Sequence, residues 1–369
     1  MFVPRGCHGR HADPPCDAAI VQRMATTAHA PLPAGSSRVV RALAALSWLV
    51  VLPLAVVALA RVIAHDASFP LIAINAFTTW IYLPAWGVAA LAIGTRRRAL
   101  AIVSCMLVTL HVAWVAPGAL RASALPAQAE TAPALRVMTA NLLAPNRQTD
   151  ATVHEILEAR PDVLVVEELT PEWLDALAAG GVTDALPFGY VVPRADCFGI
   201  GILSRKPITH YEAVDLDGVP LLRATVDVEG HPVTVLAAHT LPPRTEEYAR
   251  VWDHQMAVLS AMVERERGAV ILLGDLNATT QARNYERLVA GRLRGAHEDR
   301  GRGLATTWPN GLFPLPPIRL DHVLVSRELA VRDVRELAPN GSDHVPVVAD
   351  LAILAAPARA RGVRLSMAP

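Results

Sequence analysis

The sequence predicts a mixed α/β domain with packed β-sheets, preceded by three transmembrane helices. Two observations predict the domain: after residue 134, short aliphatic runs alternate with amphipathic segments, and hairpin-like pairs of runs appear later in the chain. A third observation predicts the membrane part. The mean hydropathy of +0.32 over 369 residues is higher than a soluble enzyme needs, so part of the chain is expected to lie in lipid.

The membrane part is predicted from three runs with no charged residue, at 42–60, 71–93 and 99–116. Each run is near the length that spans a bilayer core as a helix. Pro53 and Pro84 lie inside the first two runs, but membrane helices tolerate proline better than soluble helices do. The alternative interpretation is that these runs are buried helices of a soluble domain.

Arginine placement predicts the orientation of these helices. Arg38 and Arg41 precede the first run and Arg96, Arg97 and Arg98 fill the short link between the second and third, whereas the link between the first and second has only Arg61. Short loops rich in Lys and Arg stay in the cytoplasm. Three crossings would therefore place everything after residue 117 outside the cytoplasm, in a multi-pass protein of the inner (plasma) membrane. A cleaved signal peptide fits less well, because the first run begins far from the N-terminus.

The domain organisation follows from changes in composition. Residues 1–41 form a leader that we expect to be disordered; Cys7, His8, His11 and Cys16 could instead suggest a metal knuckle, but no second ligand cluster follows at the required spacing. Residues 42–116 carry the three helices, and 117–133 are rich in Ala and Pro, as in a semi-stiff linker. A catalytic domain over 134–356 and a basic tail over 357–369 complete the chain.

Within the catalytic domain, aliphatic runs predict strands and apolar periodicity predicts helices. The expected strands are 135–140, 163–166, 200–203, 222–228, 233–238, 269–273, 318–325, 331–337 and 345–351. Helices are expected after Asp150, between Thr170 and Gly180, and through Trp252 and Val263.

Polar residues collect at the ends of these runs. They are Asn141, Glu167, Glu168, His239, Asp275, Asn277, Asp343 and His344, and Asp321 lies within the run 318–325. Strand ends that converge at one edge of a sheet are where α/β proteins build their sites. Carboxylates, amides and imidazoles without cysteine suit a hard cation such as Mg²⁺ or Mn²⁺ and a phosphate substrate.

Five of these segments, in order, resemble the successive motifs of the endonuclease/exonuclease/phosphatase superfamily. They are Thr139-Ala140-Asn141, the run from Pro161 to Glu168, Gly274-Asp275-Leu276-Asn277, Arg319-Leu320-Asp321-His322 and Ser342-Asp343-His344. The resemblance implies a four-layer α-β-β-α sandwich of two packed mixed sheets. It also implies a divalent-metal-dependent phosphoester hydrolase, acting as a nuclease, a phosphodiesterase or a phosphatase.

The resemblance further implies a role for each site residue. Glu168, Asn141 and Asp343 would serve the metal. His344 would activate water and Asp321 would orient its imidazole, while Asp275 and Asn277 would position the nucleophile and stabilise the transition state. His239 would contact a phosphate oxygen or assist the leaving group.

Two positions stay open at the level of sequence. Glu167 stands where the family usually has a neutral residue, and because side chains alternate along a strand we expect Glu168 to be the ligand and Glu167 to point the other way. A phosphate clamp could come from one of several arginines. The candidates are Arg147, Arg194, Arg223 and Arg244.

The charge balance bears on the substrate. Residues 131–369 contain 24 Arg and Lys against 30 Asp and Glu, a net charge of −6, which does not favour binding to duplex DNA through many phosphates. Nucleic acid, a phospholipid head group and a small phosphorylated metabolite all remain candidate substrates, with the bilayer as the other partner and no protein partner inferred. The alternatives are a phospholipid-head-group phosphodiesterase, or a non-catalytic membrane protein that keeps this fold as an interaction module.

Overall fold

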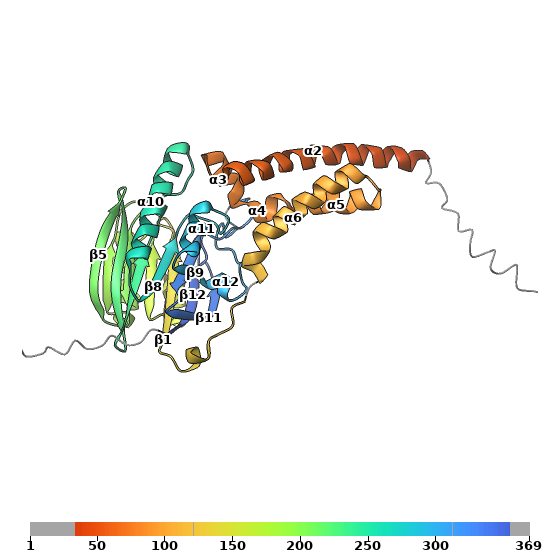
Figure 1. The fold of residues 1–369 in the computed structure, drawn as a ribbon. Helices are drawn as coiled ribbons and strands as arrows, with labels where there is room; N and C mark the ends of the chain where they lie inside the picture. Colours follow the sequence, from red (N-terminus) through yellow and green to blue (C-terminus); the bar gives the residue numbers. More distant parts are fainter. Residues whose placement is uncertain (1–33, 121, 312, 355–369) are drawn as a thin grey trace, which may run out of the picture.

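The computed structural model describes residues 34–354 except 121 and 312. A bundle of apolar helices projects from one side of an α/β domain (Figure 1). The cysteine and histidine pairs near the N-terminus and the predicted basic tail lie outside the described residues.

The apolar bundle consists of α2 (Ala34–Ala64), α5 (Leu83–Gly94) and α6 (Arg98–Leu120), packed through a shared cluster that includes Val51, Ala85 and Leu107. Two of its helices are long and apolar enough to cross a membrane, over Arg38–Ala64 and Arg98–Leu120. The count rises to three if a bent helix pair is taken as one span.

The second predicted run is not one straight helix. It divides into α3 (Phe69–Ala76), α4 (Thr78–Ile81) and α5, with a bend of 65°. Polar side chains inside the run explain the break, because Asn75 donates to the backbone oxygen of His65 at 3.1 Å and Thr78 donates to that of Asn75 at 2.7 Å. The chain therefore bends toward the connection between α2 and α3 instead of continuing as one straight helix. Helix α3 lies against the catalytic domain.

The domain contains two six-stranded mixed sheets. The first has the order β11 (Leu329–Glu336), β12 (Val347–Ile353), β1 (Ala134–Asn141), β2 (Val163–Glu167), β4 (Ile200–Ser204), β3 (Phe188–Val192). The second has the order β5 (Ile208–Leu216), β6 (Val219–Val228), β7 (His231–Ala237), β8 (Ala269–Asp275), β10 (Asp321–Ser326), β9 (Leu293–Gly295).

Each sheet contains one parallel pair joined by a helix. Strands β1 and β2 are parallel and connected through α7 (Thr149–Ala159), and β7 and β8 are parallel and connected through α10 (Glu246–Arg265). The carboxyl ends of all four strands therefore point to the same edge of the sandwich, where ligands bind in sheets of this kind.

The two sheets pack face to face, with helices on the outer faces. Val165 and Ile271 belong to the aliphatic core between the sheets. Outside the first sheet lie α7, α8 (Pro171–Ala179) and α9 (Val182–Ala185); outside the second lie α10 and α11 (Arg283–Ala290). The predicted pair of packed mixed sheets with helices is confirmed.

Helix starts are encoded locally. Thr170 accepts a hydrogen bond from the Trp173 amide at 3.2 Å with Pro171 at the first helical position, and Thr245 accepts one from the Tyr248 amide at 3.1 Å. Such caps satisfy amides that have no partner inside the helix. Several short elements were not predicted, among them β3, β9, α11 and α12 (Ala296–Asp299), and neither was β5, which is longer but largely exposed.

The segment predicted as a linker is held on the domain. Its first residues continue α6 to Leu120, and the 3₁₀ helix η1 (Ala127–Glu130) follows. The Ser123 amide donates to the Asp299 oxygen at 2.8 Å, and the Arg332 guanidinium donates to the backbone oxygen of Ala129. The segment between the helices and the domain is therefore fixed to the domain by hydrogen bonds and is not a free linker.

Candidate active site

The candidate site lies where the carboxyl ends of the two parallel strand pairs meet. Asn141 is the register partner of Glu167 in the first sheet, and Asp275 is the register partner of Asp321 in the second. Since the sheets face each other, these two pairs are brought together from opposite layers. Sequence positions 134 residues apart thus come into contact, as the bond between Asn141 and Asp275 shows.

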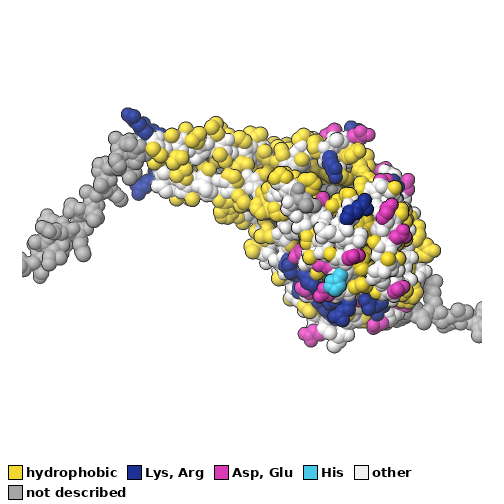
Figure 2. Space-filling model, turned by 180° about the vertical axis from the view of Figure 1, so that it is seen from behind, with side chains coloured by type: hydrophobic (Ala, Val, Ile, Leu, Met, Phe, Trp, Pro, Cys, Tyr) yellow, Lys and Arg dark blue, Asp and Glu magenta, His cyan; other side chains and the backbone are white. Residues whose placement is uncertain are grey.

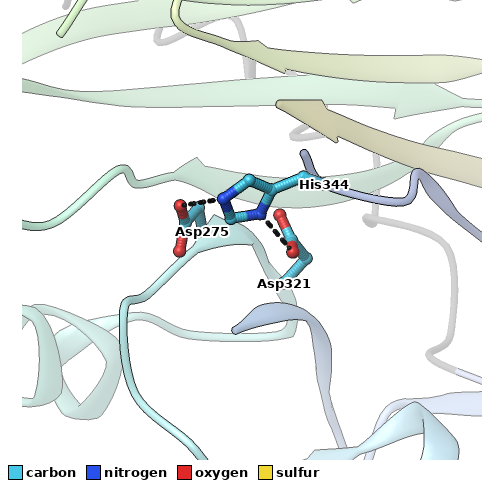
Figure 3. Close-up of side chains that lie close together, drawn as sticks. All are labelled: Asp275, Asp321 and His344. Atoms are coloured by element: carbon cyan, nitrogen blue, oxygen red, sulfur yellow. Dashed lines mark hydrogen bonds and ion pairs between the residues drawn. The ribbon is translucent and has the colours of Figure 1, made fainter. Parts of the chain in front are cut away.

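A histidine held between two carboxylates forms the centre of the site (Figure 3). The Nδ1 atom of His344 lies 2.8 Å from Oδ2 of Asp321, and its Nε2 atom lies 3.6 Å from Oδ2 of Asp275. All three side chains are buried. The short contact fixes the orientation of the imidazole, which leaves Nε2 on the side of Asp275.

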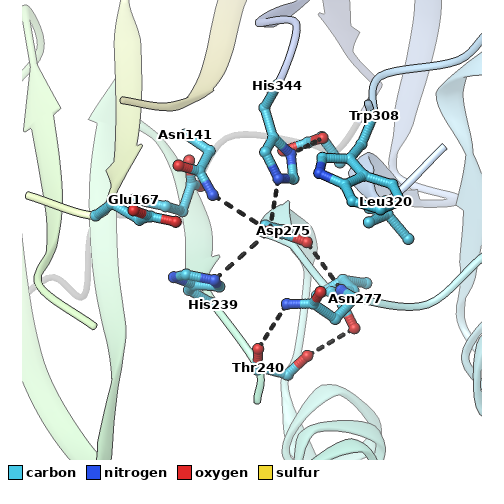
Figure 4. Close-up of polar contacts among 12 residues, drawn as sticks. Asn141, Glu167, His239, Thr240, Asp275, Asn277, Trp308, Leu320 and His344 are labelled. Carbon is cyan, nitrogen blue, oxygen red and sulfur yellow. Dashed lines mark hydrogen bonds and ion pairs between the residues drawn. The ribbon is translucent and has the colours of Figure 1, made fainter. Parts of the chain in front are cut away.

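Asp275 is the hub of the surrounding contacts (Figure 4). Its Oδ2 atom accepts from the Asn141 amide at 3.3 Å and lies 3.5 Å from Nε2 of His239. Its Oδ1 atom accepts from the backbone amide of Asn277 at 2.9 Å, and the Asn277 side chain donates to the Thr240 backbone oxygen at 2.8 Å. One carboxylate therefore links residues from four strand ends.

The backbone around Asp275 explains why its neighbours are Gly and Asn. Gly274 has φ +136°, and a Cβ atom there would lie 2.0 Å from the backbone oxygen of Ala238. Asn277 has φ +44°, in the left-handed region that asparagine tolerates better than most residues. The Gly-Asp-x-Asn sequence thus turns sharply at the end of β8 and presents both polar side chains to the site.

The two adjacent glutamates point to different places. Glu167 is fully buried behind the site, where its Oε1 atom accepts from Thr139 Oγ1 at 2.6 Å. Glu168 lines the cavity in front of the site and accepts from the Ala144 amide at 2.8 Å. The expected divergence of the two side chains is observed.

Asp343 and Ser342 shape the last motif. The Trp308 indole donates to Oδ2 of Asp343 at 3.0 Å, and Oδ1 of Asp343 is buried without a hydrogen-bond partner. The Ser342 hydroxyl donates to the Asn141 backbone oxygen at 2.8 Å and accepts from the His344 amide at 3.0 Å. Ser342 thereby ties the loop that carries His344 to the end of β1.

Burial and charge set the protonation of the site. Burial lowers the pKa of His344, but the carboxylates of Asp321 and Asp275 outweigh it and raise this pKa to about 10. Burial raises the pKa of Glu167 well above its ordinary value and also raises the pKa of Glu168. Burial lowers the pKa of His239. The site therefore stabilises an imidazolium at His344 and keeps His239 neutral.

The donor set fits a divalent cation. Asp275, Asp321 and His344 place ligand atoms within 4.8 Å of one another, and Glu168 and Asp343 line the same cavity. Among the described lining residues, Arg244 is the single Arg or Lys, so basic side chains from the protein offset the carboxylates only in part. The buried Oδ1 atom of Asp343, without a partner, also calls for a cation or a donor.

The structure brings together all eight residues that were predicted from the motifs. The short contact to Asp321 occupies Nδ1 of His344, so the close trio fits the predicted proton-transfer pair better than a set of metal ligands. Of the four candidate arginines, Arg194 is paired with Asp196 and Arg223 with Glu266, whereas Arg244 lines the cavity and Arg147 is exposed on a loop.

Sequence reasoning missed several residues that support the site. Trp308 holds Asp343, Thr139 holds Glu167, and the ring of Phe198 lies 5.5 Å from that of His239. For Ser342, its place in the Ser-Asp-His motif was the available signal. Thr139 lies in the Thr-Ala-Asn motif, which gave the same signal, whereas Trp308 and Phe198 lie in no polar pattern that marks them.

The cavity in front of these residues has a volume of about 550 Å³. One of its walls is α3, which supplies Phe69 and Ile72, with Phe77 just after the helix. The prediction treated this part of the chain as a membrane span, and it did not foresee that the span would contribute to the site.

Comparison with known proteins adds to this picture. The model of the endonuclease/exonuclease/phosphatase family matches residues 138–344. A structure of D. rerio TDP2 complexed with single-strand DNA product is 16% identical with a TM-score of 0.52, and a humanized D. rerio TDP2 is 17% identical with a TM-score of 0.51; each match covers 59% of this chain and 98% of the other.

An endonuclease/exonuclease/phosphatase structure from Beutenbergia cavernae is 22% identical with a TM-score of 0.49, over 60% of this chain and 72% of that one. No curated protein sequence matches the chain. The TDP2 structures confirm the fold alone. The family match spans more than half of the chain and ends at His344. The chain therefore belongs to the endonuclease/exonuclease/phosphatase family.

Proposed function

We propose that this protein is a divalent-metal-dependent phosphoester hydrolase, anchored in a membrane by its N-terminal helices with its catalytic domain on the extracytoplasmic side. Family membership supports a hydrolase of phosphoesters. The observation that carries the proposal is the buried His344–Asp321 pair directed at Asp275, beside a cavity lined by Glu168 and Asp343.

The proposed division of labour follows the geometry. Nε2 of His344 faces the site, and when the ring is neutral it takes a proton from the attacking water, while Asp321 holds the ring and stabilises the imidazolium that results. Asp275 positions the water, and Asn277 donates to the developing charge on the phosphoryl oxygens. His239, which burial keeps neutral, contacts a phosphate oxygen or the leaving group. Arg244 binds a phosphate oxygen from the opposite side of the cavity.

Glu168, Asn141 and Asp343 would hold the cation, which is proposed to be Mg²⁺ or Mn²⁺. When bound, it would polarise the phosphoryl group, and its charge would offset the carboxylates that raise the pKa of His344.

Membrane anchoring is supported by the surface of the helices. Hydrophobic side chains cover them along their length (Figure 2). Leu49 is 70% exposed, Val56 66% and Ile102 69%, and in water each such side chain would cost free energy. Arg96, Arg97 and Arg98 lie in the turn between α5 and α6, at the end away from the catalytic domain (Figure 1). The positive-inside rule then favours a cytoplasmic turn and an extracytoplasmic domain.

Two experiments test the proposal. The full chain in detergent should hydrolyse bis-p-nitrophenyl phosphate with Mg²⁺ or Mn²⁺, and the rate should fall to background with EDTA; a rate that EDTA leaves unchanged would refute metal dependence. For the topology, a reporter that is active only in the cytoplasm, fused after Pro369, should stay silent. Signal from that fusion would place the domain inside.

A further inference from the structure

The apolar wall of the cavity is built from the segment that connects the membrane helices. Helix α3 supplies Phe69 and Ile72, Phe77 follows at its end, and the loop before β10 supplies Phe313, Leu315 and Leu320. The catalytic side chains of Glu168, Asp275 and His344 lie in the same cavity. One cavity therefore joins a polar reaction centre to an apolar region.

Helix α3 is held on the domain at both of its ends. Before it, Asp66 accepts from the Arg283 amide at 2.7 Å. The buried guanidinium of Arg61 donates to Thr78, just after α3, at 2.8 Å and to Gln281 of the catalytic domain at 3.1 Å. After it, the Trp80 indole donates to the Pro317 oxygen at 2.8 Å. These bonds hold α3 against the domain, where it forms one wall of the cavity.

Apolar side chains are exposed both at the end of α2 and in the lining of the cavity. Val62 and Ile63, at the end of α2 next to the domain, are 64% and 73% exposed. Phe313 and Leu315, which line the cavity, are 49% and 47% exposed. Exposed apolar side chains that adjoin membrane helices favour contact with lipid. The mouth of the cavity would thus lie at the bilayer surface.

Charge at the cavity argues against a long polyanion. Arg244 is the single Arg or Lys among the described lining residues, and residues 131–369 carry a net charge of −6. Binding a nucleic acid requires several phosphate contacts from basic side chains. One phosphate beside an extended apolar group matches the lining better. The volume of about 550 Å³ accommodates a head group and the first part of its hydrocarbon chains.

We infer that the substrate is a membrane phospholipid, whose phosphoester reaches the His344 centre while its hydrocarbon chains lie against α3 and the Phe313 loop. This inference rests on the proposed hydrolase activity and names the substrate class for it. The N-terminal segment then does more than anchor the enzyme, because it forms the part of the site that selects the substrate.

Matched variants on α3 test the inference. Ile72 lines the cavity, whereas Ile74, on the same helix, is 37% exposed and does not line it. The full chain in nanodiscs of phosphatidylcholine and phosphatidylglycerol is assayed for lipid hydrolysis, and in detergent for hydrolysis of bis-p-nitrophenyl phosphate. We expect Ile72→Asn to lower kcat/KM for lipid about tenfold more than for the soluble diester, as about 1.4 kcal/mol of lost contact would. Ile74→Asn should change neither.

A second variant guards against a folding defect. Phe313 lines the cavity from the loop before β10, outside α3, so Phe313→Ser should produce the same selective loss, with the soluble diester reporting that the domain is intact. Equal losses on both substrates, or no loss on either, would overturn the inference while leaving the hydrolase activity standing. Faster cleavage of a single-stranded oligonucleotide than of lipid would overturn it as well. If the wild-type chain hydrolyses none of these substrates, the proposed function itself fails.

Discussion

The two walls of the active-site cavity differ in origin and in chemistry. The polar wall comes from strand ends within residues 138–344 and presents Glu168, Asp275 and His344. The α3 wall comes from residues 69–76, outside the family match, and presents Phe69 and Ile72. The polar wall contains a dense network of hydrogen bonds, whereas the α3 wall presents apolar side chains.

This difference indicates that reaction and selection are encoded in separate parts of the chain. The polar wall needs fixed geometry, so its residues follow strand ends and tight turns such as the one at Gly274. The α3 wall needs shape and apolar area, which many sequences supply. Substitutions in one wall, or in the contact between α3 and the domain, should therefore have separable effects, the largest of them in the polar wall.

Removing the imidazole should have the largest effect. His344→Ala deletes the proposed base, and we expect kcat on both lipid and soluble diester to fall by about 10²- to 10⁴-fold. Asp321→Asn should cause a smaller loss, because the imidazole of His344 remains but loses its negatively charged partner. His154→Ala is the matched control, since that histidine is 82% exposed on α7. Selective loss on one substrate only would show that His344 serves binding instead.

Removing the charge of Glu168 should weaken the cation site. Glu168→Gln keeps the shape of the side chain, and we expect the Mg²⁺ concentration for half-maximal activity to rise by about 10- to 100-fold. Glu158→Gln, at a side chain that is 77% exposed, is the matched control. The measurement is a metal titration of the hydrolysis rate. A lower kcat with an unchanged metal requirement would remove Glu168 from the cation site.

A pH-dependent contact links the α3 wall to the domain. Hydrogen bonds to Asp66 and Glu286 raise the pKa of His65 to about 9. A raised pKa means that the docked state holds the proton more tightly, so this stabilisation is complete below about pH 6.5 and is lost as the pH rises through about 9.

We expect His65→Gln to increase hydrogen exchange of residues 69–76 by a few fold at pH 7, because a partly exposed pair contributes under about 1 kcal/mol. At pH 10 the variant and the wild type should exchange alike. An equal difference at both pH values would exclude titration of His65 as the cause.

The smallest effect is expected at Glu167. Burial raises its pKa well above the ordinary value, which favours the neutral carboxyl group, the form that resembles an amide. Glu167→Gln should keep kcat within about twofold, since a neutral carboxyl and an amide both donate and accept hydrogen bonds. Glu167→Leu removes the acceptor of the hydrogen bond from Thr139 and should lower kcat further. A large loss in the Gln variant would mean that a charged Glu167 takes part in the reaction.

The polar wall could be predicted from the sequence because its residues follow strand ends in recognisable motifs. Asn141 and Asp275 meet as expected, since parallel strands place their carboxyl ends at one edge. His344 joins them because it precedes β12, which runs antiparallel to β1 and so begins at the same edge. The strands themselves were visible as fully buried aliphatic runs such as Val163–Glu167. For this wall, the local sequence pattern is enough to predict where each residue lies in the fold.

The α3 wall could not be predicted, because hydropathy does not distinguish a span from a helix that turns back. The break at Phe77 depends on the bonds from Asn75 to His65 and Asp66 in the connection after α2, and on the bond from Thr78 to the backbone oxygen of Asn75. Edge elements such as β3 and β9 were missed for a related reason, since exposed or short strands lack a continuous aliphatic run. These features depend on contacts between distant segments.

Release of a phosphorylated product from phospholipid nanodiscs tests the central claim most directly. The full chain, the His344→Ala variant and the wild type with EDTA are compared by mass spectrometry of the lipid products, with the oligonucleotide assayed in parallel. The account predicts metal-dependent lipid cleavage by the wild type, background levels in the other two samples and slower cleavage of the oligonucleotide. Lipid cleavage that survives EDTA or the loss of His344 would contradict it, as would an enzyme that cleaves the oligonucleotide and leaves the lipid intact.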